Sequence, residues 1–523
     1  MSIDTGNADP ASLSALRRET VHLVAVKSAV ALAGRLISVP CTIAATYLLG
    51  PFQVGVLAIL QLVHTYAGYA HLGILDALYR NVPIAYGRGD ADEARRITHT
   101  AYTGWLISLV ATTIGLWLLF AAGVTVDGAL NPRRLVLLTA IIWVNGALTF
   151  LRDFAKAEGR LMAIARSDVI QTIVAPLATL PAVYWLALDG ALLVLVATSL
   201  LAVVQLYALL GRPVLRLRFD AGRTVALIRI GALVLVNRTT DSLFWAVDLM
   251  VLTALRTPIE VGIYSVALAV LKATAIFAGG FNQMIYRKMM SDTGAFGNER
   301  RDHYRKYVGG LLVAYLLFNS VITGLATLGF IAVVQLALTD YERSVDVLVL
   351  LTLGFSTYSS LALVRYFMDA IGQLPRRLWI VGAAAVVNAA LDYAVLSAGY
   401  DVVAVAWAGT ACFFVNGAVM LALTFKQVHG SYAPALSFIA RLLAVSLFGT
   451  GFLAVCAQWQ AVGLVAADFV IKALAFTGLT SGLYLLLFRP EHPERELRPV
   501  LAYAWTAVSS RVLAWRSAER PIS

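Results

Sequence analysis

Residues 34–80 read GRLISVPCTIAATYLLGPFQVGVLAILQLVHTYAGYAHLGILDALYR and decide how the rest of the chain is interpreted. The stretch predicts two long apolar helices joined by a tight turn at residues 49–51. It carries the ionisable residues Arg35, His71, Asp76 and Arg80. An ionisable group at the centre of a membrane helix costs roughly 2.5–3.5 kcal/mol on insertion scales, so such groups tend to face a bundle interior or a wet cavity. The stretch therefore indicates a membrane protein that handles a polar substrate.

The composition of the whole chain extends this interpretation. Of 523 residues, 60% are hydrophobic and only 14% are charged, which excludes an ordinary soluble enzyme. A helix needs about 20 apolar residues to cross the hydrocarbon layer, and 14 segments meet this requirement. The predicted spans lie near residues 24–48, 53–80, 98–124, 134–156, 162–187, 190–210, 225–255, 260–286, 307–337, 344–371, 377–398, 402–425, 434–457 and 461–488.

The charged residues predict the topology of these spans. The net charge is +11, but the basic residues recur at the ends of apolar segments, so nucleic-acid binding is not expected. Basic residues gather in alternate connections, and the positive-inside rule then places these connections and both termini in the cytoplasm. Residues 1–23 and 489–523 are predicted to be cytoplasmic tails of a multi-pass inner-membrane protein.

The sequence carries no signal for a cofactor, a metal or an enzyme. Cys41, Cys412 and Cys456 each lie within an apolar run, which favours packing over a disulfide or a metal cluster. No glycine-rich nucleotide loop of the GxxxxGK[ST] type occurs, so direct ATP hydrolysis is not expected. The connections are short and hold no cluster of histidines or carboxylates, which argues against a membrane-embedded glycosyltransferase or polymerase.

An internal repeat divides the chain into halves. Residues 51–56 (PFQVGV) match residues 258–263 (PIEVGI) at an offset of 207, and the same offset pairs residues 73, 79 and 80 with identical residues at 280, 286 and 287. A second pair of segments, 152–161 and 365–374, matches at an offset of 213. An even number of spans separates the copies, so both have the same orientation and are expected to be related by an axis along the membrane normal.

These motifs, together with an early arginine in the first span, resemble the polysaccharide transporter family of the multidrug/oligosaccharidyl-lipid/polysaccharide flippase superfamily. The resemblance covers about residues 20–490 and is nearest to O-antigen and exopolysaccharide repeat-unit flippases. It implies an all-helical fold with two six-helix lobes around a V-shaped cavity, here residues 24–211 and 212–428, and two extra spans in residues 429–488. In related lipid II flippases the last two spans help to hold the lipid tail.

The resemblance implies a substrate as well. Such a flippase carries an undecaprenyl-diphosphate-linked oligosaccharide from the inner to the outer leaflet by alternating access. Its expected partners are the lipid-linked oligosaccharide and membrane lipids, with a polysaccharide polymerase and glycosyltransferases of the same pathway. The alternative is a cation-coupled multidrug or metabolite exporter of the same superfamily, whose cavity would be lined by acids and aromatic residues. Sugar composition, coupling ion and oligomeric state stay open.

A diphosphate substrate calls for cations, because the planar fork of arginine can hold two phosphate oxygens. Arg35, Arg238 and Lys272 lie well inside predicted spans and are the leading candidates for the cavity. The alternative for each is a structural ion pair, for instance Arg238 with Asp241 or Asp248.

Other charged residues have secondary roles in this prediction. Arg80 and Arg287 lie near cytoplasmic ends of spans, where a substrate gate and an anchor to lipid headgroups are equally compatible with their position. Candidate coupling carboxylates, which would bind a proton or cation, are Asp76, Asp241 and Asp248. Asp468 and Lys472 are four residues apart, and we expect them to pair on one helix face.

Overall fold

The computed structural model describes residues 10–123, 130–275, 307–459 and 463–489. The chain is a multi-span membrane protein whose regular elements, within these ranges, are all helical. Eleven helical stretches of the described part are long and apolar enough to cross a membrane. The chain forms two compact units, residues 1–262 and 263–523. The predicted count of 14 spans and the predicted domain boundaries stay predictions.

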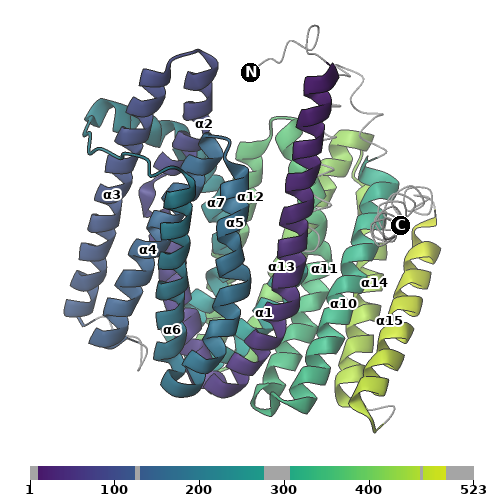
Figure 1. The fold of residues 1–523 in the computed structure, drawn as a ribbon. Coiled ribbons are helices and arrows are strands. Elements are labelled where there is room, and N and C mark those ends of the chain that lie inside the picture. The colour runs from purple at the N-terminus through teal and green to yellow at the C-terminus, as the bar shows by residue number, and fades with distance from the viewer. Residues whose placement is uncertain (1–9, 124–129, 276–306, 460–462, 490–523) are drawn as a thin grey trace, which may run out of the picture. The chain divides into compact units, whose positions relative to one another are not determined.

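Unit 1 contains the elements from α1 to α7. They are α1 (Pro10–Ala67), a 3₁₀ turn (Gly68–His71), α2 (Ile74–Gly87), α3 (Ala91–Ala121), α4 (Pro132–Ala157), α5 (Leu161–Val169), a π-helical turn (Ile170–Val174), α6 (Ala175–Leu209) and α7 (Ala221–Leu255). Within the unit, α6 packs against α1 and α4, while α2 packs against α3, α4 and α7 (Figure 1). Two of these helices contain a non-helical residue: Gly50 breaks α1 at the predicted turn, and Ala187 breaks α6.

Short acidic and amide side chains set where several helices of unit 1 begin. Asp90, Asn131 and Asp220 each accept a hydrogen bond from the backbone N–H three residues later, at the start of α3, α4 and α7. These N-caps satisfy N–H groups that have no partner inside a helix. The caps therefore fix where α3, α4 and α7 begin.

The two copies of the proline–glycine motif meet each other in unit 1. A methyl group added at Gly55 would overlap the carbonyl oxygen of Pro258, and one added at Gly262 would overlap the carbonyl oxygen of Pro51. The contact is thus reciprocal, as expected for two copies of one motif that cross at their glycines. Because only glycine allows backbones to approach this closely, the contact explains the glycines that the repeat shares. The matching residues at 280, 286 and 287 lie outside the described residues.

Unit 2 contains most of the helix Pro258–Ala275 and the elements that follow it. These are a π-helical turn (Tyr307–Leu311), α10 (Leu312–Leu336), a 3₁₀ turn (Thr339–Tyr341), α11 (Glu342–Ala370), α12 (Leu374–Ser397), α13 (Val402–His429), α14 (Ala433–Gln458) and α15 (Val465–Leu487). Helix α11 packs extensively against α13, while α15 lies against α10 and α14. The two extra helices of the prediction, α14 and α15, are therefore integral to the packing of unit 2.

A buried ion pair links the ends of α14 and α15. Lys472 Nζ lies 2.7 Å from Asp468 Oδ2, which confirms the predicted pair, and their side chains are only 6% and 4% exposed. The same ammonium donates to the carbonyl oxygens of Cys456 at 2.9 Å and Trp459 at 2.5 Å. Since the last carbonyls of a helix have no partner inside it, Lys472 caps the end of α14 from the neighbouring helix.

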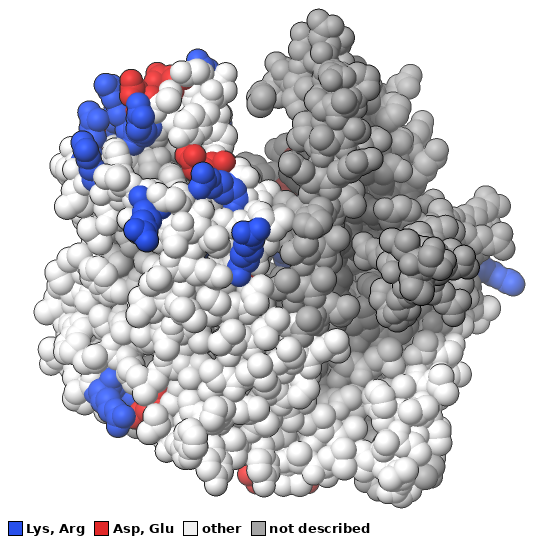
Figure 2. Space-filling model, in the orientation of Figure 1, with Lys and Arg blue, Asp and Glu red and all other residues white. Residues whose placement is uncertain are grey.

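Charged side chains are unevenly distributed over the visible face of unit 1. Figure 2 shows most of the lysines and arginines at one end of the unit, over α3 and the linker between α6 and α7, with a smaller group at the opposite end. The broad surface between these ends is almost free of charge in this view. This pattern is typical of a membrane protein whose basic loops lie on one side.

Candidate functional site

The second predicted span is broken in unit 1. The sequence predicts a single helix over residues 53–80, but helical geometry stops after Ala67 and resumes at Ile74. Between them lie the 3₁₀ turn and two residues in left-handed conformations, Leu72 with φ 51° and Gly73 with φ 85°. Broken helices at membrane depth occur where the exposed backbone is buried in protein or lines a cavity, and they often mark binding sites.

Two groups stabilise this break. The side chain of His71 is buried, and its Nδ1 accepts a hydrogen bond of 3.1 Å from the backbone N–H of Gly73. On the other side of Gly73, a methyl group added there would overlap the backbone of Gly231 in α7, and one added at Gly231 would overlap the carbonyl of Gly73. The backbones of α2 and α7 are therefore in direct contact at the break, and the side chain of His71 is hydrogen-bonded to the backbone there.

An arginine from α7 and a carboxylate from α2 meet beside the break. Arg238 Nη1 lies 3.4 Å from Asp76 Oδ1, and the guanidinium lies over the ring of Tyr69, 5.6 Å from its centroid. The side chain of Arg238 is 52% exposed, whereas that of Asp76 is 13% exposed. The second carboxylate oxygen of Asp76 is buried and has no hydrogen-bond partner among the described residues. A ligand can thus reach the side chain of Arg238, whereas that of Asp76 is largely shielded.

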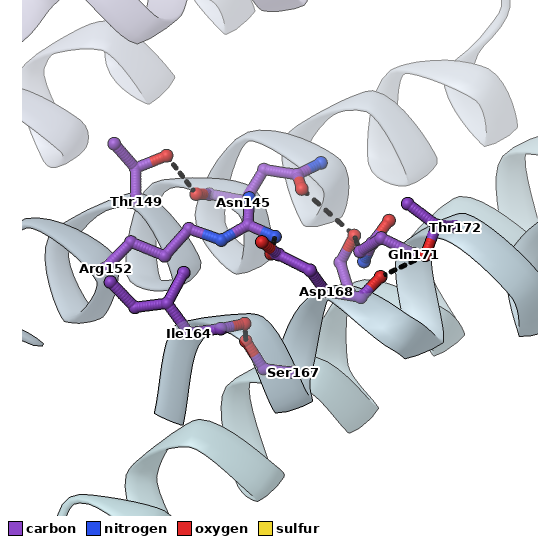
Figure 3. A network of polar contacts seen from close by, with 9 residues as sticks. Asn145, Thr149, Arg152, Ile164, Ser167, Asp168, Gln171 and Thr172 are labelled. Atoms are coloured by element: carbon purple, nitrogen blue, oxygen red, sulfur yellow. Dashed lines mark hydrogen bonds and ion pairs between the residues drawn. The ribbon is translucent and has the colours of Figure 1, made fainter. Parts of the chain in front are cut away.

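A second polar network lies in the same unit, among α4, α5, the π-helical turn and α6 (Figure 3). Ser199 donates to Asn145 Oδ1 at 2.9 Å and accepts from Gln171 Nε2 at 3.2 Å. Nearby, Arg152 lies 2.5 Å from Asp168, and the two side chains are 30% and 36% exposed.

The π-helical turn brings this second network together. Gln171 and Thr172 both lie within it, and Thr172 packs against Gly34 of α1. A π-helical turn shifts the register of the helix by one residue and is frequent at functional sites. Arg152 is held by Asp168 in the structure.

Unit 2 contains a small cavity among α10, α11, α14 and α15. Its volume is about 30 Å³, which is room for a water molecule but not for a substrate. Asn319 Oδ1 and Thr480 Oγ1 line the cavity region, are buried and have no hydrogen-bond partner among the described residues. The cavity can therefore hold a water that satisfies these atoms, and it is not a substrate site.

The remaining predicted residues are placed as follows. Arg80 is exposed near the middle of α2, and Lys272 is exposed in the helix Pro258–Ala275 of unit 2. Asp248 is buried and Asp241 is half-buried, both in α7. Arg287 and the side chain of Arg35 lie outside the described residues, so the roles predicted for them stay predictions. Of the predicted substrate and coupling residues, the structure brings together Arg238 and Asp76, which were assigned to different roles.

The sequence prediction missed Asp168, although the signal was present. Asp168 is an ionisable residue inside the predicted span 162–187, the same criterion that selected Asp76 and Arg238. Asn145, Gln171 and Ser199 carry no such signal, because uncharged polar residues are common in membrane helices and only the fold brings these three together.

Comparisons with known proteins bear on the fold. No protein-family model and no curated protein sequence matches the chain. Among solved structures, the lipid II flippase MurJ in an inward closed conformation is similar with a TM-score of 0.60 and 12% identity, covering 88% of this chain and 98% of that one. An inward-facing multidrug resistance MATE family transporter of the MOP superfamily has a TM-score of 0.57 and 14% identity, covering 77% and 98%. The chain therefore has the fold of MOP-superfamily transporters.

Proposed function

We propose that this chain is a flippase that moves an undecaprenyl-diphosphate-linked oligosaccharide from the inner to the outer leaflet of the bacterial inner membrane. It would do so by alternating access, for O-antigen or exopolysaccharide synthesis. The observation that carries the proposal is the half-exposed side chain of Arg238 beside the helix break at Leu72 and Gly73. A cation there suits an anionic substrate, because a guanidinium can hold phosphate oxygens in bidentate fashion.

The other cations predicted from the sequence belong to the same proposal. Arg35 and Lys272 would help to receive the diphosphate, and Arg80 and Arg287 would act near the membrane surface as a gate or an anchor. The MurJ-like fold over 88% of the chain is compatible with a lipid-linked substrate. A polyprenyl tail also needs an apolar surface, which helices α14 and α15 would offer.

The second candidate is an exporter of cationic drugs or metabolites, which the MATE-like fold allows. A cationic substrate would be repelled by Arg238 and attracted by Asp76. Because Arg238 is the more exposed member of the pair, the geometry favours the anion.

Replacing Arg238 by glutamine tests the proposal in a strain that lacks the chromosomal copy. A charge-assisted hydrogen bond contributes about 1.5–3 kcal/mol, so we expect polymer export to fall by about tenfold to a hundredfold. The lipid-linked oligosaccharide should accumulate on the cytoplasmic side, which is measured by its protection from an external glycosidase.

Arg133→Gln is the matched control, since Arg133 is exposed and pairs with Asp189 at 3.2 Å outside this site. Export by this variant should match the wild type. Unchanged export by Arg238→Gln at equal protein levels, or altered drug tolerance without a change in polymer, would refute the flippase assignment.

A further inference from the structure

The ion pair between Arg238 and Asp76 is long, and its two side chains differ in exposure. At 3.4 Å the two atoms are farther apart than in a strong charge-assisted hydrogen bond, which measures about 2.7–2.9 Å. One carboxylate oxygen of Asp76 makes no hydrogen bond with the described residues, while about half of the Arg238 side chain is accessible. An incoming phosphate can therefore reach the guanidinium without first opening the fold, and it can form better hydrogen bonds than Asp76 does.

Loss of the contact with Arg238 would deprive the Asp76 carboxylate, which is only 13% exposed, of its nearest counter-charge. Such a charge is expensive away from water, and the group becomes neutral by binding a proton instead. In the empty site, the positive Arg238 and the negative Asp76 cancel. In a site with one phosphate charge on Arg238 and a protonated Asp76, the charges cancel again, which keeps the electrostatic cost of the site low in both states.

The surroundings of Asp76 supply no obvious replacement for Arg238. Lys156 of α4 also acts on Asp76, but it already lies 2.7 Å from Asp153 of the same helix. His71 precedes Asp76 by five residues, lies in the field of Arg238 and Asp153, and uses its Nδ1 to accept from Gly73.

Helix α3 also packs against α2. Its charged residues Asp92, Glu93, Arg95 and Arg96 lie in its first turns. Farther along α3, His99 accepts a hydrogen bond from the backbone N–H of Arg216, and the ring of Tyr102 packs against Phe150. Asp76 lies 12 residues before Arg88, the C-cap residue of α2. This separation corresponds to roughly 18 Å along the helix axis. Arg238 is therefore the main counter-charge of Asp76.

We propose that Arg238 and Asp76 form an exchange pair, in which an anionic phosphate of the substrate displaces the Asp76 carboxylate from Arg238 and Asp76 takes up one proton from water. The carboxylate becomes a carboxylic acid, no other bond forms or breaks, and release of the phosphate returns the proton. The inference rests on the proposed function in requiring an anionic substrate, and it adds a proton as an obligatory co-ligand of the same site.

The test is calorimetric titration of the purified full chain with geranyl diphosphate, in buffers of different ionisation enthalpy. We expect the wild type to take up close to one more proton per bound diphosphate than Asp76→Asn, which keeps the shape of the side chain but cannot titrate. Because binding and proton uptake are linked, the affinity of the wild type for geranyl diphosphate should fall by up to about tenfold for each pH unit of increase. The diphosphate itself also titrates, and its contribution is measured with Asp76→Asn and subtracted.

Two further variants complete the experiment. Asp189→Asn is the matched control, because Asp189 is a 20% exposed carboxylate that pairs with Arg133 and Arg134 away from α2 and α7. It should show wild-type proton uptake, whereas Arg238→Gln should bind geranyl diphosphate at least tenfold more weakly.

The outcomes separate this inference from the function on which it rests. Equal proton uptake by wild type and Asp76→Asn would overturn the exchange pair and leave the anion site standing. If the wild type does not bind geranyl diphosphate, the exchange pair is overturned as well. Binding of tetraphenylphosphonium with proton release, in place of diphosphate binding, would overturn both proposals.

Discussion

Replacement of Lys472 by methionine is expected to lower the free energy of unfolding by about 3–5 kcal/mol, because it removes one partner of a buried ion pair. Asp468 would keep its charge in a position where its side chain is only 4% exposed. The carbonyl oxygens of Cys456 and Trp459 would lose their shared donor at the end of α14. The measurement is the thermal unfolding of the purified protein, in which the variant should melt well below the wild type.

A second substitution separates the loss of the ion pair from the loss of the carbonyl contacts. Adding Asp468→Asn to Lys472→Met removes the carboxylate charge that has lost its ammonium partner, so we expect the double variant to recover a large part of the lost stability. Lys426→Met is the matched control, since Lys426 is exposed and lies 4.5 Å from the ring centroid of Tyr432. Its loss should cost about 1 kcal/mol or less. A melting temperature of Lys472→Met equal to that of Lys426→Met would contradict the role assigned to the buried pair.

The features that the sequence could predict are those that depend on neighbouring residues. The turn around Gly50 follows from a glycine and a proline between apolar runs, and the Asp468–Lys472 pair follows from helical spacing. Asp90, Asn131 and Asp220 mark helix starts because a short polar side chain can reach the N–H three residues later. In each case the interacting residues are only a few positions apart, so the local sequence contains both partners.

The candidate site escaped prediction because its partners are remote from each other. Asp76 and Arg238 are 162 residues apart, and both were selected as ionisable residues in apolar spans without any indication that they meet. The break at Leu72 and Gly73 was missed because residues 53–80 contain no proline, and a glycine in a membrane helix is common. The backbone of Gly231 lies directly against the break, a contact that only the packing of α2 against α7 creates.

This backbone contact between α2 and α7 makes Gly231 the position where a very small change should have a large effect. Gly231 lies within a helix, so alanine suits its backbone conformation, and helix propensity alone would favour the substitution. However, the added methyl group would overlap the carbonyl group and the Cα of Gly73, and neither can move as a flexible side chain could. We expect Gly231→Ala to cost about 3 kcal/mol, the upper part of the usual range for overpacking.

The consequence of this substitution should extend to function. Separation of α2 from α7 would move Asp76 away from Arg238, because each lies within two turns of the contact, at Gly73 and Gly231 respectively. We therefore expect Gly231→Ala to reduce both the melting temperature and polymer export. Gly222→Ala is the matched control on the same helix, since its added methyl would meet only Asp220 Oδ1 at an ordinary 3.6 Å. Gly222→Ala should melt at or above the wild-type temperature, and the same behaviour in Gly231→Ala would show that the break in the second span does not depend on α7.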